Sequence, residues 1–196
     1  MAHFSSFLRI AALSNTQQIN FANISRDTGV PVTSVRAWFE ILQDSFLGFL
    51  LEPWHGPKRK AVGTAKMYFF DIGVANFLSG VHSLRRDSSE YGIAFEHFIA
   101  MELRAWCSYR RIKEHLRYWR TREGLEVDFL VGTDLAVEVK ASSRIHSADL
   151  RGLRALKDEA LFKKRIVVCM EEQSRCTDDG IFILPWQQFL TELWQE

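Results

Sequence analysis

The stretch EVDFLVGTDLAVEVK, residues 126–140, contains the pattern that decides the fold. In residues 126–129 and again in residues 135–140, charged or small side chains alternate with apolar ones. That two-residue period is typical of a β-strand with two different faces. The three residues between the strands, Gly132, Thr133 and Asp134, are typical of a turn. The stretch therefore predicts an antiparallel β-hairpin.

The polar face of this hairpin carries four charged side chains. With residues 132–134 as the turn, Asp128 lies directly opposite Glu138, and Glu126 lies opposite Lys140. Directly opposed residues have Cβ atoms about 5 Å apart, so the two acidic groups repel each other unless positive charge lies between them. The register therefore predicts a pair of facing carboxylates.

A divalent cation would resolve this repulsion, and oxygen ligands on a rigid sheet suit Mg²⁺ or Mn²⁺. Lys140, on the same face, could orient or help to deprotonate an attacking water, or stabilise charge developing on a phosphate. The alternative is a solvated surface hairpin in which Glu126 and Lys140 form an ordinary cross-strand pair.

Glu96 is a further candidate, because it lies in the apolar helical row of Ile93, Ala100 and Leu103. Burial of an unpartnered carboxylate is costly. Glu96 therefore either reaches solvent or has a cationic or metal-bound water partner.

Around the hairpin, the pattern predicts further elements that alternate between helix and strand. We expect a helix at 90–105, strands at 116–121, 125–131, 135–141, 165–170 and 180–184, and helices at 148–158 and from Pro185 onward. Such an order indicates a mixed α/β sheet flanked by helices, over residues 90–196.

Residues 1–80 predict a separate winged-helix-like unit, joined by a linker at 81–89. Three helical segments, in which Asn23 is expected to cap the second, precede two apolar stretches joined by a basic loop. The exposed face of the third helix offers Arg36 beside Glu40, which is poor equipment for reading the major groove. The wing is better supplied, and its candidate nucleic-acid-binding residues are Lys58, Arg59, Lys60 and Lys66. The alternative is a solvated basic loop.

The composition supports a folded protein and sets limits on its class. With 47% hydrophobic residues and a net charge of +1, the chain is not disordered, and its overall charge does not indicate a nucleic-acid binder. The three cysteines have no metal-binding spacing and no leader precedes the first helix, so we expect free thiols and a cytoplasmic location. No apolar run approaches the roughly 20 residues of a membrane span.

Several short motifs together resemble the DUF4143 domain, the C-terminal region of many prokaryotic AAA-type ATPases. The likeness covers about residues 4–170 and rests on motif order: PKR at 57–59, YFFDIG at 68–73, FE at 95–96, EL at 102–103, YWR at 118–120, EVDFLV at 126–131 and VEVK at 137–140. The resemblance implies a PD-(D/E)XK nuclease-like fold for residues 90–196. It also implies catalytic roles for Glu96, Asp128, Glu138 and Lys140, with the carbonyl of Val139 joining Asp128 and Glu138 as a metal ligand.

The function expected from the resemblance is a metal-dependent nuclease-like domain that acts on DNA, attached to or working with an AAA-type ATPase. No Walker motif occurs in the chain, so we expect no ATPase activity from it; either it is a fragment or the ATPase has been lost. The alternative is a catalytically silent module that binds nucleic acid or a partner protein. Arg120 is a candidate for nucleic-acid contact within a basic set that would otherwise be solvated: Arg104, Arg110, Arg111, Lys113, Arg117 and Arg122. An aromatic stripe on the last helix is expected to be core, with homo-oligomerisation as the alternative: Trp186, Phe189, Leu190 and Trp194.

Overall fold

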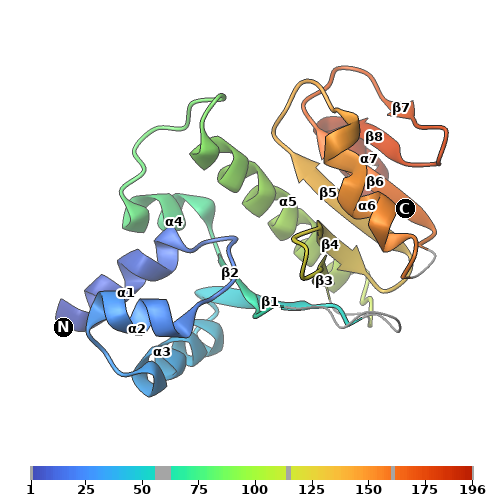
Figure 1. The fold of residues 1–196 in the computed structure, drawn as a ribbon. Coiled ribbons are helices and arrows are strands. Elements are labelled where there is room, and N and C mark those ends of the chain that lie inside the picture. Colours follow the sequence, from blue (N-terminus) through green and yellow to red (C-terminus); the bar gives the residue numbers. More distant parts are fainter. Residues whose placement is uncertain (1, 56–62, 114–115, 160–161, 196) are drawn as a thin grey trace. The chain divides into compact units, whose positions relative to one another are not determined.

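The computed structural model describes residues 2–55, 63–113, 116–159 and 162–195, and the chain divides into two compact units (Figure 1). The first unit comprises Met1–Leu51 and Thr64–His97, and the second comprises Glu52–Gly63 and Phe98–Glu196. The helix α5 (Ser89–Tyr109) contributes residues to both units. None of the helices in the described ranges is long and apolar enough to cross a membrane.

The first unit contains helices and a β-hairpin in the expected order. Its elements are α1 (Ala2–Leu13), α2 (Phe21–Thr28), α3 (Val32–Asp44), β1 (Gly48–Pro53), β2 (Lys66–Phe69) and α4 (Ile72–Ser79). β1 and β2 pair antiparallel from Gly48–Phe69 to Leu51–Lys66. The candidate residues Lys58, Arg59 and Lys60 lie outside the described residues.

The boundaries of α2 correct one detail of the sequence analysis. The N-cap is Asn20, whose side chain accepts a hydrogen bond from the Asn23 backbone N–H at 3.0 Å, so Asn23 is the capped residue rather than the cap. Phe7, Phe39 and Met67 belong to the buried apolar cluster of this unit. The helices are therefore held by a core of their own.

The second unit is built on a mixed sheet flanked by helices, as the sequence predicts. Its strands are β3 (Leu116–Arg120), β4 (Glu126–Val131), β5 (Leu135–Lys140), β6 (Lys164–Cys169), β7 (Arg175–Cys176) and β8 (Phe182–Pro185). Their spatial order is β3-β4-β5-β6-β8-β7, and the last two residues of β1 pair with β3. β5, β6 and β8 run parallel, while the pairs β3–β4, β4–β5 and β7–β8 are antiparallel.

Helices cover the two faces of this sheet. The single-turn η1 (Ser147–Leu150) and α6 (Arg151–Leu156) bury their leucines in one cluster with Ala136 and Val167. α7 (Trp186–Gln195) instead places Phe189 and Leu193 beside Leu135 and Ile166. Neighbouring residues of a strand point to opposite faces, so α6 and α7 lie on opposite sides of the sheet.

Two glycines set the geometry around the β4–β5 hairpin. Gly132 adopts φ +53° in the three-residue turn, a conformation that favours glycine. A Cβ added at Gly152 in α6 would lie 1.9 Å from the carbonyl oxygen of Glu126. α6 therefore approaches the first residue of β4 as closely as it does only because position 152 has no side chain.

Candidate functional site

The β4–β5 hairpin has the predicted register, and it opens where the acidic residues begin. The strands pair at Val131–Leu135, Leu130–Ala136 and Phe129–Val137, so the prediction of a turn at 132–134 is confirmed. Continuing that register would bring residue 128 opposite residue 138. The residue pairing of the ladder ends before that point.

Beyond the Phe129–Val137 pair, the side chain of Asp128 rather than its backbone bonds to β5. Its Oδ2 accepts a hydrogen bond from the backbone N–H of Val139 at 2.8 Å, and the residue is only 7% exposed. In a strand, the N–H and the C=O of one residue point to the same side. The carbonyl of Val139 is therefore directed toward the β4 side, where Asp128 lies.

Glu138 is a buried carboxylate of the site with only one of its two oxygens hydrogen-bonded. It is 6% exposed, and its Oε1 accepts a hydrogen bond from Lys140 Nζ at 2.5 Å. Its Oε2 is buried and has no hydrogen-bond partner within the described part of the chain. Burial, followed by the negative charge of Asp128, raises the pKa of the Glu138 carboxyl well above its ordinary value, although Lys140 opposes this shift.

Lys140 completes the charged group from the same face of β5. Burial by itself lowers the pKa of Lys140, but the carboxylates of Glu138 and Asp128 outweigh that effect and raise it above its ordinary value. Asp149, in η1, acts in the same direction. Because the pKa values of both Glu138 and Lys140 are raised, the site attracts positive charge, whether as protons or as a cation.

These donors fit a hard divalent cation. No group of three His, Cys, Asp or Glu side chains that could hold a metal ion occurs among the described residues. The available oxygens are those of Asp128, of Glu138 (including the unpartnered Oε2) and of the Val139 carbonyl. Two carboxylates and a carbonyl suit Mg²⁺ or Mn²⁺, which complete their coordination with water.

Glu126 pairs with Arg120, whereas the solvated-hairpin alternative placed Glu126 in a cross-strand pair with Lys140. Arg120 on β3 lies beside Glu126 on β4, and its Nη1 contacts Glu126 Oε2 at 2.6 Å. Lys140 bonds to Glu138 instead. This pairing follows from the sheet order, because β3 flanks the opposite side of β4 from β5.

Glu96 belongs to the first unit, where Lys66 is the cationic partner that the sequence analysis gave as one possibility for this carboxylate. Its Oε1 contacts Lys66 Nζ at 3.3 Å and accepts a hydrogen bond from Tyr68 OH at 2.6 Å. Lys66 is 4% exposed, so its ammonium is buried against Glu96 rather than presented on the surface as the nucleic-acid role requires. The structure thus brings together Asp128, Glu138, Val139 and Lys140 in the second unit.

Sequence reasoning missed two neighbours of these groups. Tyr68 belongs to the YFFDIG motif, and its hydroxyl donates a hydrogen bond to Glu96 that the motif alone does not reveal. Asp149 lies in η1, nine residues after Lys140 in the chain, and its negative charge helps to raise the pKa of Lys140. The capping pattern around Asp149, whose Oδ2 accepts from the backbone N–H of His146 at 2.8 Å, was the available signal.

Comparison with known proteins gives two family matches. A family model described as "Domain of unknown function (DUF4143)" matches residues 91–189, just over half of the 196 residues. A second, described as "Domain of unknown function (DUF8612)", matches residues 1–85. No curated protein and no solved structure matches the chain.

Proposed function

The chain belongs to the DUF4143 family, and from the geometry of Asp128, Glu138 and Lys140 we propose that its second unit is a metal-dependent, PD-(D/E)XK nuclease-like domain acting on DNA. The observation that carries the proposal is the buried, unpartnered Oε2 of Glu138 beside a second carboxylate. A buried polar atom without a partner is expensive, so its retention favours a function.

The proposed metal ligands are Asp128, Glu138 and the Val139 carbonyl, which line the opening between β4 and β5. When bound there, Mg²⁺ or Mn²⁺ would supply Lewis acidity toward the scissile phosphate and a water of lowered pKa. Occupancy of the two carboxylates by a cation would also lower the pKa of Lys140, because their charge is what raises it.

Lys140 is the proposed catalytic side chain for charge stabilisation. With its raised pKa, it is protonated at neutral pH and can donate to a non-bridging oxygen of the phosphate. The overall reaction is hydrolysis: a water oxygen bonds to phosphorus, the phosphorus–oxygen ester bond breaks, and the leaving oxygen takes up a proton. The family resemblance also implies a water-orienting role for Glu96, which in the structure is engaged by Lys66 and Tyr68 within the first unit.

The partners follow from the resemblance and from the first unit. We propose that the winged-helix-like unit contacts the DNA backbone, that Arg120 assists from the second unit, and that an AAA-type ATPase delivers the substrate. Arg120 is partly engaged by Glu126, so contact with a phosphate would exchange one anion for another.

A catalytically silent binding module is the second candidate, and one observation favours it. Both carboxylates already have internal partners, since Asp128 Oδ2 accepts a hydrogen bond from Val139 N–H and Glu138 Oε1 accepts one from Lys140. A fold that retained these groups only for structure would show the same two bonds.

The test incubates the purified chain with single- and double-stranded DNA and RNA in Mg²⁺ or Mn²⁺, beside Asp128→Asn and Lys140→Met. Asp134→Asn is the matched control, because Asp134 is an exposed carboxylate in the turn of the same hairpin, paired with Lys163. The proposal predicts metal-dependent cleavage by the wild type and the control, and none by the two site variants.

Metal binding is measured separately by thermal unfolding. A cation at about one hundred times its Kd stabilises the folded state by about 2.7 kcal/mol, and Asp128→Asn should remove that stabilisation. Metal-dependent stabilisation without cleavage, even with the ATPase supplied, would identify the silent module. Absence of both effects would refute the metal site.

A further inference from the structure

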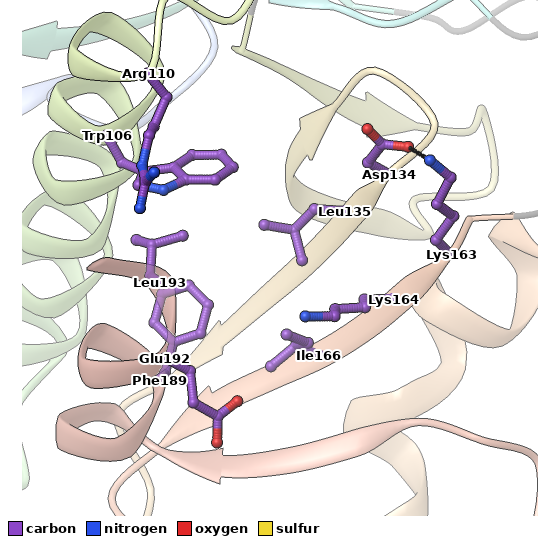
Figure 2. A pocket seen from close by; sticks show the side chains of 10 residues that line it. All are labelled: Trp106, Arg110, Asp134, Leu135, Lys163, Lys164, Ile166, Phe189, Glu192 and Leu193. Carbon is purple, nitrogen blue, oxygen red and sulfur yellow. Dashed lines mark ion pairs between the residues drawn. The ribbon is translucent and has the colours of Figure 1, made fainter. Parts of the chain in front are cut away.

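A pocket of about 390 Å³ lies in the second unit, on the face of the sheet that carries α7 (Figure 2). Its walls come from the C-terminal ends of α5 and α7 and from the starts of β5 and β6. Protein interiors are close-packed, so a hollow of this size forfeits contacts that a bound molecule would restore. Its volume falls in the range of small-molecule sites.

The pocket is distinct from the carboxylate site. Leu135 and Ile166 line it, whereas Glu138 and Lys140 share the opposite face with Ala136. Leu135 is also the first residue of β5, while Lys140 is the last. The two sites therefore lie on opposite faces and at opposite ends of the same strand.

The interior of the pocket is apolar. Figure 2 shows Phe189 and Leu193, on α7, across the pocket from Leu135 and Ile166, on the sheet. The side chains of these four residues have no hydrogen-bonding groups. Such a lining favours an apolar body, because polar groups placed against it would lose water without gaining partners.

Each of the three cations in the described lining already has a partner. Lys163 forms an ion pair with Asp134 at 2.6 Å. Arg110 Nη2 donates a hydrogen bond to the backbone carbonyl of Trp194 at 3.5 Å. Lys164 is also engaged within the chain and is not a free cation. The head of a charged ligand would therefore have to compete with existing interactions.

Negative charge in and around the lining offsets these cations. Glu192 accepts a hydrogen bond from Gln188 at 2.8 Å and keeps its negative charge. Three cations thus face two anions, Asp134 and Glu192. The pocket also lies at the C-terminal ends of two helices, each of which carries roughly half a negative charge. These two ends offset the remaining cation, so the described lining has no excess charge with which to attract an ion.

We propose that this pocket binds an uncharged apolar small molecule, whose body fills the space between α7 and the starts of β5 and β6. The apolar interior supplies the affinity, and the balanced charges at its edge disfavour an ionic head of either sign. This assignment goes beyond the nuclease proposal and shares no residue with it, so either one can fail without the other.

The first test compares ligands that share a body and differ in charge. The full chain is titrated at neutral pH with uncharged N-phenyl-1-naphthylamine and with its 8-sulfonate, and the fluorescence of each probe is followed. The uncharged probe should bind at least about tenfold more tightly than the sulfonate. Decanol should likewise displace the bound uncharged probe at a concentration at least about tenfold lower than decanoate. Neither comparison requires a variant.

The second test locates the bound probe with substitutions. Leu193→Trp places a larger side chain in the pocket and should weaken binding of the uncharged probe about tenfold or more. Leu190→Trp is the matched control, because Leu190 belongs to the same helix and does not line the pocket. Lys164→Met and Arg110→Met replace exposed residues and should change the affinity for the uncharged probe by less than about twofold.

Four results would overturn the proposal. The sulfonate could bind as tightly as the uncharged probe, or decanoate could displace that probe as readily as decanol. The two leucine variants could bind the uncharged probe equally well. Loss of a lysine or arginine from the lining could weaken its binding about tenfold, which would show that the cations hold the ligand. If Leu193→Trp does not fold, as followed by circular dichroism, the comparison of charged and uncharged ligands on the wild type decides.

Discussion

Acidification should destabilise the first unit through one side chain, His97. This residue is fully buried, and its Nδ1 lies 2.9 Å from Asn15 Nδ2. The Asn15 oxygen already accepts from the backbone N–H of Phe69 at 3.0 Å, so its amide nitrogen is the donor toward His97. A protonated imidazole would place two donors face to face, in addition to the cost of a buried charge.

The size of the effect follows from the pKa of His97. Burial lowers it from 6.5 to about 4, although the Phe69 backbone and Asp71 act in the opposite direction. Between these pH values the unfolded chain binds a proton that the folded chain does not. The stabilisation is therefore complete above pH 6.5 and is lost as the pH falls toward 4. At about 1.4 kcal/mol per pH unit, the loss reaches about 3 kcal/mol.

The assay is urea unfolding across this pH range, followed by circular dichroism, for the wild type and His97→Asn. Asparagine keeps an acceptor for Asn15 but cannot titrate, so the variant should lose less free energy of unfolding on acidification, by about 3 kcal/mol. His82→Asn is the control, because His82 belongs to the same unit and is exposed. Equal pH dependence in the wild type and His97→Asn would refute the reasoning.

Three further predictions concern single positions. Glu138→Gln should raise the free energy of unfolding at neutral pH by about 1–2 kcal/mol, since it removes the repulsion from Asp128, and should abolish thermal stabilisation by Mn²⁺; a destabilised variant would contradict this. Phe46 follows α3 with φ +59°, a backbone conformation that favours glycine, and its side chain is 78% exposed. Phe46→Gly should therefore raise the free energy of unfolding, measured in urea, by about 1 kcal/mol. A loss of stability would show that the Phe46 ring makes stabilising contacts. Gly152→Ala should lower the free energy of unfolding by about 3 kcal/mol or more, because the alanine Cβ would overlap the Glu126 carbonyl oxygen. A thermal unfolding temperature close to that of the wild type would show instead that α6 can move away from β4.

The sequence was sufficient for the β4–β5 hairpin because several local signals agree. Alternation fixed which residues share a face, and a three-residue turn with a glycine at positive φ fixed the register of Val131 with Leu135. The surrounding strands and helices were predictable for the same reason, since each has its own periodicity. The two-residue strand β7 (Arg175–Cys176) was missed, because so short an element has no period to detect.

What the sequence could not provide depends on contacts between distant segments. The opening of the ladder at Asp128, where a carboxylate replaces a backbone pair, is not encoded in alternation. The pairing of Glu126 with Arg120 was not foreseen, because the hairpin alone does not reveal that β3 flanks β4. The pocket beside Trp106 required α5 and β6 to meet, and they lie more than fifty residues apart in sequence.

The contrast between Glu96 and Glu138 shows why side-chain partners matter more than burial for recognising a functional site. Glu96 lies in an apolar helical row and Glu138 on the polar face of the hairpin, yet both carboxylates are largely withdrawn from solvent. The Glu96 carboxylate is paired with Lys66 and hydrogen-bonded by Tyr68, and a carboxylate with such partners can be purely structural. Glu138 keeps one oxygen without a partner, while burial and a second carboxylate raise the pKa of its carboxyl group. Local rules of stability are broken mainly where function requires it, so the unresolved charge, rather than the acidic residue itself, is what points to the end of β5.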